Sequence, residues 1–183
     1  MRIIAGTYRG TVLAEVGEGD TEAHLRPTSD RVRESLFSML THLDVIRGAR
    51  VLDLFAGTGA LALEALSRGA SKAILVESGR VGQKLIAQNI EKVRAGGNAT
   101  LMRNDATQLG AWIAAPFDLV FLDPPYGKGM GQQALLAARA GGWLVKGALV
   151  VWEENAAMEA PRGFTRTDRR KYGSTHVTLL SVD

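Results

Sequence analysis

The tetrapeptide Asp123-Pro124-Pro125-Tyr126 follows a hydrophobic segment and carries the most specific chemistry in this sequence. Two consecutive prolines fix the backbone and remove two N–H donors, so the Asp123 carboxylate and the Pro124 carbonyl form a rigid pair of acceptors. An exocyclic amine on a base is a weak nucleophile, because its lone pair is delocalised into the ring. Accepting hydrogen bonds from its two protons favours a pyramidal nitrogen that can attack a methyl group. Tyr126 offers a flat face for a base withdrawn from its stack. The motif predicts an amino nitrogen as methyl acceptor and leaves the base open.

A glycine turn precedes this motif in the chain. Residues 51–55 read as a buried strand that runs into Ala56-Gly57-Thr58-Gly59, and Ala62 completes a G-x-G-x-x-A spacing. Glycines at such a turn let the backbone approach a nucleotide-like ligand closely. Glu77 ends the next strand, where a carboxylate can accept hydrogen bonds from both hydroxyl groups of a ribose. NAD, FAD and S-adenosylmethionine all present such a ribose, so the turn alone does not identify the cofactor.

Asp53 favours S-adenosylmethionine among these cofactors. A carboxylate inside the first strand repels the pyrophosphate of a dinucleotide, whereas S-adenosylmethionine has no phosphate and carries a positive sulfonium and ammonium. Asp105 either accepts the adenine amino group or caps the next helix, and the sequence leaves both open. The residues that we expect to bind the cofactor are Asp53, Phe55, Ala56, Gly57, Thr58, Gly59, Glu77, Asp105 and Ala106.

Short apolar runs alternate with helical segments along most of the chain. We expect strands at 51–55, 73–77, 99–103, 117–122 and 148–152, and helices at 29–41, 60–67, 81–95, 106–114 and 132–140. Residues 163–171 and 175–182 read as a terminal hairpin antiparallel to the rest. The alternation predicts an α/β fold, with a doubly wound, mostly parallel, seven-stranded Rossmann-like sheet. Segments 2–5 and 11–16 predict a small N-terminal β-hairpin, so that residues 1–24 form an extension and residues 25–183 a catalytic domain.

Composition sets the outer limits of the interpretation. The chain has 183 residues, of which 46% are hydrophobic, as expected for one domain with one sizeable core. The absence of cysteine excludes disulfides and zinc-thiolate sites, and the three histidines (His24, His42 and His176) lack metal-ligand spacing. We therefore expect no metal. No apolar stretch is long enough to cross a membrane, so we expect a cytoplasmic protein without a membrane partner.

Longer motifs spread over nearly the whole chain resemble the class I methyltransferases, and more closely the RsmD family of bacterial 16S ribosomal RNA guanine-N2 methyltransferases. The motifs are Arg2-Ile3-Ile4-Ala5-Gly6 with Arg9-Gly10, Leu25-Arg26-Pro27-Thr28 with Asp30-Arg31-Val32-Arg33-Glu34, Asp53 to Gly59, Asp123 to Tyr126, and Lys171-Tyr172-Gly173. The resemblance implies S-adenosylmethionine as cofactor and methyl transfer to N2 of the guanine numbered 966 in 16S ribosomal RNA, within an assembling small subunit. Many members have Phe in place of Tyr126, and a different dipeptide in place of Ser78-Gly79. Neither difference alters the expected chemistry.

Basic residues near both ends of the chain could hold RNA phosphates. The net charge is only +3, so their placement matters more than the total. The candidates are Arg9, Arg26, Arg31, Arg33, Arg169, Arg170 and Lys171, with Arg162 and Arg166 adding to the local charge. For any one arginine the alternative is a solvated face or a pairing within a helix, for example Asp30 with Arg33.

Other functions fit parts of the sequence. The Asp123–Tyr126 motif also occurs in adenine-N6 and cytosine-N4 DNA methyltransferases, so guanine rests on the N-terminal motifs. The glycine turn and Glu77 would suit an NAD-dependent oxidoreductase, which Asp53 opposes. A catalytically silent RNA-binding scaffold would not need an intact Asp123–Tyr126 motif.

Overall fold

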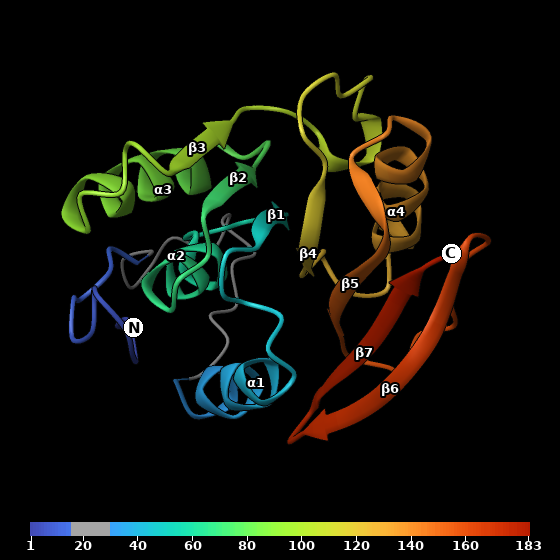
Figure 1. Cartoon of the computed structure of the whole chain (residues 1–183), viewed down its shortest axis with the longest axis horizontal. Helices are drawn as coiled ribbons and strands as arrows, with labels where there is room; N and C mark the ends of the chain where they lie inside the picture. Colours follow the sequence, from blue (N-terminus) through green and yellow to red (C-terminus); the bar gives the residue numbers. More distant parts are fainter. Residues whose placement is uncertain (16–29) are drawn as a thin grey trace.

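A computed structural model describes residues 1–15 and 30–183 (Figure 1). Its helices are α1 (Asp30–His42), α2 (Ala60–Ser67), α3 (Arg80–Lys92), the short 3₁₀ helix η1 (Ala106–Gln108) and α4 (Met130–Ala140). Its strands are β1 (Arg50–Leu54), β2 (Lys72–Val76), β3 (Ala99–Met102), β4 (Phe117–Leu122), β5 (Leu144–Glu154), β6 (Phe164–Tyr172) and β7 (Thr175–Val182).

The strands form one sheet of seven in the order β3-β2-β1-β4-β5-β7-β6. The first five are parallel, and β7 is antiparallel to both β5 and β6. The predicted parallel sheet with a terminal antiparallel hairpin is thereby confirmed. The strand order reverses between β1 and β4, which is the place where open α/β sheets bind ligands.

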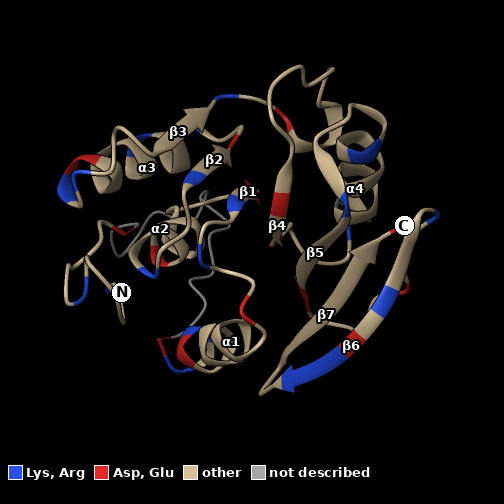
Figure 2. Ribbon diagram, in the orientation of Figure 1, with Lys and Arg blue, Asp and Glu red and all other residues tan. Residues whose placement is uncertain are grey.

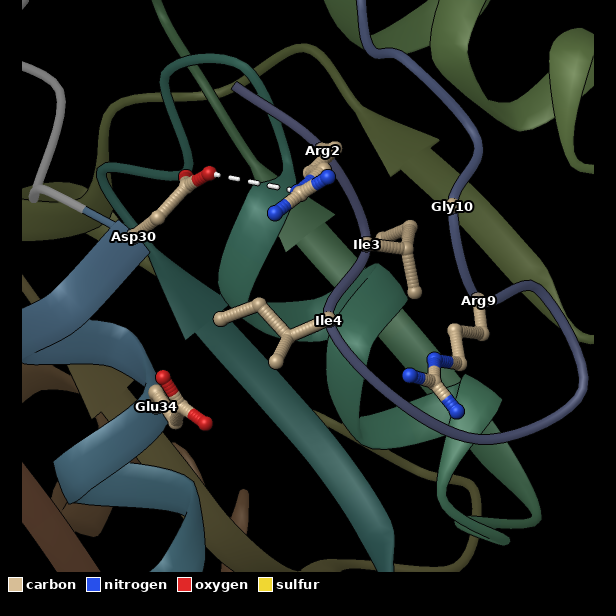
Figure 3. A pocket seen from close by; sticks show the side chains of 7 residues that line it. All are labelled: Arg2, Ile3, Ile4, Arg9, Gly10, Asp30 and Glu34. Atoms are coloured by element: carbon tan, nitrogen blue, oxygen red, sulfur yellow. Dashed lines mark ion pairs between the residues drawn. The ribbon is translucent and has the colours of Figure 1, made fainter.

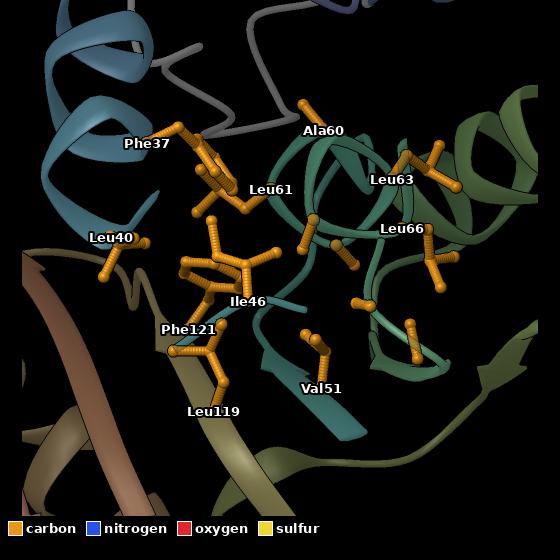
Figure 4. Packing of buried hydrophobic residues seen from close by; sticks show 14 of the residues in the cluster. Phe37, Leu40, Ile46, Val51, Ala60, Leu61, Leu63, Leu66, Leu119 and Phe121 are labelled. Atoms are coloured by element: carbon orange, nitrogen blue, oxygen red, sulfur yellow. The ribbon is translucent and has the colours of Figure 1, made fainter. Parts of the chain in front are cut away.

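Helices cover both faces of the sheet (Figure 1), because the central strands are apolar on both sides. One core joins α1, α2 and α3 to Val51, Leu119 and Phe121, and the other joins α4 to Leu52, Val120 and Leu122. Figure 4 shows the first core, where Phe37 of α1 reaches Phe121 of β4 with ring centroids 5.6 Å apart. The site residues at the ends of β1 and β4 therefore project from a rigid sheet.

The N-terminal segment lies on α2 and α3 rather than forming two regular strands. The predicted hairpin exists as a single antiparallel bridge between Arg2 and Val12, and residue 16 lies outside the described residues. Buried side chains hold the segment: Glu64 accepts the N–H groups of Ile4 (2.7 Å) and Ala5 (3.1 Å). Because the side chains of the helices satisfy these backbone groups, the segment does not need a complete β-ladder.

The predicted helix at 106–114 is wrong beyond its first turn. Only Ala106–Gln108 are helical, and the chain then runs as a loop to β4. Tertiary contacts override the helical pattern. The Trp112 ring stacks on Trp143 with ring centroids 4.3 Å apart, and the backbone N–H of Trp112 donates to the Gly141 carbonyl at 2.8 Å. The other helices and strands occur where predicted, with bounds shifted by a few residues and β5 extended to Leu144–Glu154.

No helix in the described part of the chain has both the length and the apolar character needed to cross a bilayer.

Candidate methyl-transfer site

The two motifs meet at one edge of the sheet. Leu54 pairs with Leu122 in the parallel β1–β4 ladder, so the glycine turn after β1 lies beside the Asp123–Tyr126 loop after β4. The Asp123 N–H points to the Leu54 carbonyl at 3.5 Å. This edge is the carboxyl end of the parallel strands, and it lies at the reversal of strand order. A ligand on the turn would thus reach the loop.

The glycine turn is a tight bend from β1 into α2. Phe55, Gly57 and Gly59 all have positive φ, which is unusual for the phenylalanine and points to a constrained backbone. Gly59 has a φ of 78°, which larger residues rarely adopt, and a Cβ atom would lie 2.8 Å from the Leu75 side chain, so a larger residue would be strained there. The predicted cofactor residues Phe55 to Gly59 all lie in this bend.

Glu77 lies against the same turn. Its Oε2 accepts the Gly57 N–H at 2.9 Å and its Oε1 accepts the Gly79 N–H at 2.7 Å. These bonds fix the carboxylate and leave one lone pair on each oxygen for a further donor, such as a ribose hydroxyl. At Gly82 of α3 a Cβ would lie 2.8 Å from the Glu77 Cγ, so this glycine lets the helix pack on the acid. We did not predict Gly82, although a glycine inside a helical pattern signals such a close approach.

Asp53 is almost fully buried, with 2% of its surface exposed. Its Oδ2 accepts the Ala62 N–H in the first turn of α2 at 3.2 Å. Burial raises the pKa of Asp53 to about 8; the Ala62 hydrogen bond opposes this rise, and the charges of Glu77 and Glu153 add to it. Asp53 therefore supports the first turn of α2. A nearby cation would favour ionisation of its carboxyl group.

The Asp123 carboxyl lies among other acids. Burial raises its pKa well above the usual value, and the charges of Glu153, Asp53 and Glu154 raise it further. Burial also raises the pKa of the half-buried Tyr126 to about 12, together with the charges of Asp123 and Glu153 and against a hydrogen bond with the Thr175 side chain. A positive ligand beside Asp123 would offset the repulsion and ionise it.

Two adjacent acids at the end of β5 belong to this edge and were missing from our sequence analysis. Glu154 Oε1 accepts the Gly127 N–H at 3.2 Å, which ties the Asp123–Tyr126 loop to β5. Glu153 is buried, with 1% of its surface exposed. Two consecutive acids at the end of an apolar strand were the available signal, since fully buried carboxylates are rare unless they are paired.

At Asp105 the capping alternative is confirmed. Its Oδ1 accepts the Thr107 N–H (2.8 Å) and hydroxyl (2.7 Å) at the start of η1. Ala106 is buried beside it. A contact of either residue with adenine remains a prediction.

The predicted RNA-binding residues have different surroundings. Arg31 and Arg9 are exposed, and Arg9 lines a cavity of about 220 Å³ with Arg2, Asp30 and Glu34 (Figure 3). Arg33 is buried, with 1% exposed, and donates to the Arg2 carbonyl (2.6 Å) and to Asp30 (2.7 Å). The expectation of a phosphate contact from Arg33 is therefore corrected to the helix pairing that was its alternative. Arg26 lies outside the described residues.

The C-terminal basic residues lie on the edge strand β6, where Figure 2 shows a stretch of Lys and Arg. Arg169 pairs with Glu159 at 3.1 Å, Arg170 pairs with Asp168 at 2.9 Å, and Lys171 is exposed. These exposed pairs are weak, and a phosphate contact from any of the three residues remains a prediction.

Within residues 1–15 and 30–183, no three His, Cys, Asp or Glu side chains are arranged to hold a metal ion.

The sheet order and the two motifs at its edge define a Rossmann-like methyltransferase fold. Magnesium protoporphyrin IX methyltransferase (ChlM) from Synechocystis PCC 6803, solved with bound SAM, shares this fold with a TM-score of 0.64 at 14% identity, over 88% of each chain. The chain belongs to the family described as conserved hypothetical protein 95, whose model matches residues 1–181, and the resemblance to the RsmD family is confirmed.

Two individual relatives agree with this assignment. Ribosomal RNA small subunit methyltransferase D from Escherichia coli (strain K12) is 38% identical over 161 residues, which cover 88% of this chain and 78% of that protein. The solved structure of yhhF from Escherichia coli has a TM-score of 0.83 and 35% identity, over 100% of this chain and 98% of the other.

Proposed function

We propose that this chain transfers a methyl group from S-adenosylmethionine to N2 of the guanine numbered 966 in 16S ribosomal RNA. The observation that carries the proposal is the β1–β4 register, which brings the glycine turn and the Asp123–Tyr126 loop to one edge. The family and the Escherichia coli relative named as a ribosomal RNA small subunit methyltransferase support an RNA substrate. The same relationship supports action on an assembling small subunit in the cytoplasm.

The residues at this edge fit S-adenosylmethionine better than a dinucleotide. Glu77 has acceptor capacity beside the turn, and Asp53 and Asp123 are buried acids that a positive ligand would stabilise. A pyrophosphate would meet the same acids with repulsion. When bound, the cofactor supplies an electrophilic methyl group on a positively charged sulfur.

Asp123 and Pro124 would prepare the acceptor. The Asp123 carboxylate and Pro124 carbonyl accept hydrogen bonds from the two amine N–H groups and orient the nitrogen lone pair towards the methyl carbon. As the N–C bond forms, the C–S bond breaks and its electron pair stays on sulfur. The methylated nitrogen then loses one proton to the Asp123 carboxylate. Alignment of nitrogen, carbon and sulfur supplies most of the rate, up to about 7 to 11 kcal/mol in favourable cases.

A transfer assay tests the proposal. The protein, methyl-labelled S-adenosylmethionine and unmethylated 16S RNA, free or in small subunits, are incubated beside duplex DNA. We expect label in RNA at N2 of guanine 966. Asp123→Asn should lose at least about a hundredfold in rate, whereas Asp44→Asn, at an exposed turn position that tolerates asparagine, should keep the wild-type rate. Label only in DNA would refute the RNA substrate, and full activity of Asp123→Asn would remove Asp123 from the mechanism.

A further inference from the structure

Glu153 is a buried acid to which the mechanism above gives no function. It lies next to the last rung of the β4–β5 ladder, where Leu122 pairs with Trp152, so Asp123 and Glu153 follow in register on adjacent parallel strands. Paired residues of parallel strands project to the same face of a sheet. On the other side Glu153 pairs with Val177 of β7. The two carboxyl groups are thus neighbours at the site edge.

The same face continues across β1. Asp53 pairs with Phe121, which lies two residues before Asp123 and pairs with Val151, two residues before Glu153. The side chains of Asp53, Asp123 and Glu153 therefore project from three adjacent strands to the same side of the sheet. Asp53 and Glu153 are 2% and 1% exposed. Like charges held this close and this far from water do not all ionise.

The charge of Glu153 reaches each ionisable group of the reacting centre: it acts on Asp53, on Asp123 and on Tyr126. Other titratable groups on the described elements that adjoin this edge include Glu77 after β2, Glu154 in β5, His176 in β7, which pairs with Glu154, and Tyr172 in β6, which pairs with Thr175.

We propose that Glu153 is a positioning residue of the methyl-transfer site, coupled to Asp123 as a carboxyl pair that holds a proton in the free protein and releases it when the sulfonium of S-adenosylmethionine binds. The inference rests on the proposed function. The pair therefore imposes an order of steps: Asp123 is ionised, and can accept a hydrogen bond and then one proton from the amine, only in the complex with the charged cofactor. The demethylated product, S-adenosylhomocysteine, has a neutral sulfur and would let the pair take its proton back, which favours product release.

Calorimetry with two ligands tests this. Titrations of S-adenosylmethionine and of S-adenosylhomocysteine, each in two buffers of different ionisation enthalpy at pH 7, give the protons released by each. Both ligands carry the same ammonium and ribose, so the difference between them isolates the effect of the sulfonium. We expect wild type to release more protons with S-adenosylmethionine, by a difference of up to about one.

Three variants give the comparison its specificity. Glu153→Gln should bring the difference close to zero, Glu153→Asp should restore most of it, and Glu91→Gln, an exposed matched change on α3, should leave it at the wild-type value. Equal proton release for the two ligands in wild type, or a wild-type difference in Glu153→Gln, would overturn the proposal. The wild-type titration decides alone if Glu153→Gln does not fold. Failure of S-adenosylmethionine to bind wild type at all would instead refute the proposed function.

Discussion

Replacing Asp53 by asparagine should stabilise the free protein at high pH. The folded-state pKa of Asp53 is raised to about 8 from an ordinary value of 3.8, chiefly by burial. Between these two pH values the unfolded chain has lost the proton that the folded protein keeps, so the free energy of unfolding falls as pH rises. The slope is up to about 1.4 kcal/mol per pH unit, or about 4 kcal/mol between pH 5 and pH 8. Asparagine keeps an oxygen for the Ala62 N–H and has no proton to lose.

Urea unfolding at several pH values measures this effect. Asp53→Asn and wild type should have similar stability at pH 5, and the variant should be more stable by about 4 kcal/mol at pH 8. Asp44→Asn, an exposed change of the same kind, should follow the wild-type curve. Curves for Asp53→Asn and wild type that run parallel from pH 5 to pH 8 would refute the argument that Asp53 is kept protonated by burial. The variant should also bind S-adenosylmethionine more weakly. Weaker binding would show that Asp53 lowers the stability of the free protein at high pH but contributes to cofactor binding.

Three further substitutions test other parts of the account. Gly82→Ala would bring a Cβ to 2.8 Å from Glu77 Cγ and displace that acid, so calorimetry should show roughly tenfold weaker S-adenosylmethionine binding. Gly96→Ala, with open space around it, should bind the cofactor normally. Equal affinities of Gly82→Ala and Gly96→Ala would show that cofactor binding does not depend on the position of Glu77. Asn89→Ala removes bonds to Ala14 (2.6 and 3.1 Å) and Thr58 (2.9 Å), so urea unfolding should show a loss of about 2–4 kcal/mol. A loss below about 0.5 kcal/mol would mean that these bonds do not hold the N-terminal segment. Lys171→Glu on β6 should weaken RNA binding and reduce the slope of log K against log salt concentration by about one, unlike Lys84→Glu on α3. Identical salt slopes for the two variants would exclude Lys171 of β6 from the RNA interface.

Most of the fold followed from short apolar runs, because central strands of a parallel sheet are buried on both faces. Val51 to Leu54 and Phe117 to Leu122 are examples, and both occur as predicted. The helix expected at 106–114 failed because Trp112 finds a better partner in Trp143, which is distant in sequence. The hairpin expected at the N-terminus became an arm held by Glu64, which no local pattern indicates.

The site was predictable where chemistry depends on consecutive residues. The glycine turn and the Asp123–Tyr126 loop are motifs of this kind, and parallel-sheet topology brings them together. Glu153 becomes a neighbour of Asp123 only through the β4–β5 register, which the sequence does not specify. Arg33 is the reverse case, a predicted RNA-binding residue that is buried in the structure. Its burial against Arg2 and Asp30 depends on how the N-terminal segment packs, which the sequence does not specify.

Mapping of methyl groups on 16S ribosomal RNA from cells lacking this protein tests the central claim most directly. The account predicts that guanine 966 loses its N2-methyl group in the deletion strain, and that the wild-type gene restores it whereas the Asp123→Asn gene does not. A methyl group retained at guanine 966 in the deletion strain, or restored by Asp123→Asn, would contradict it.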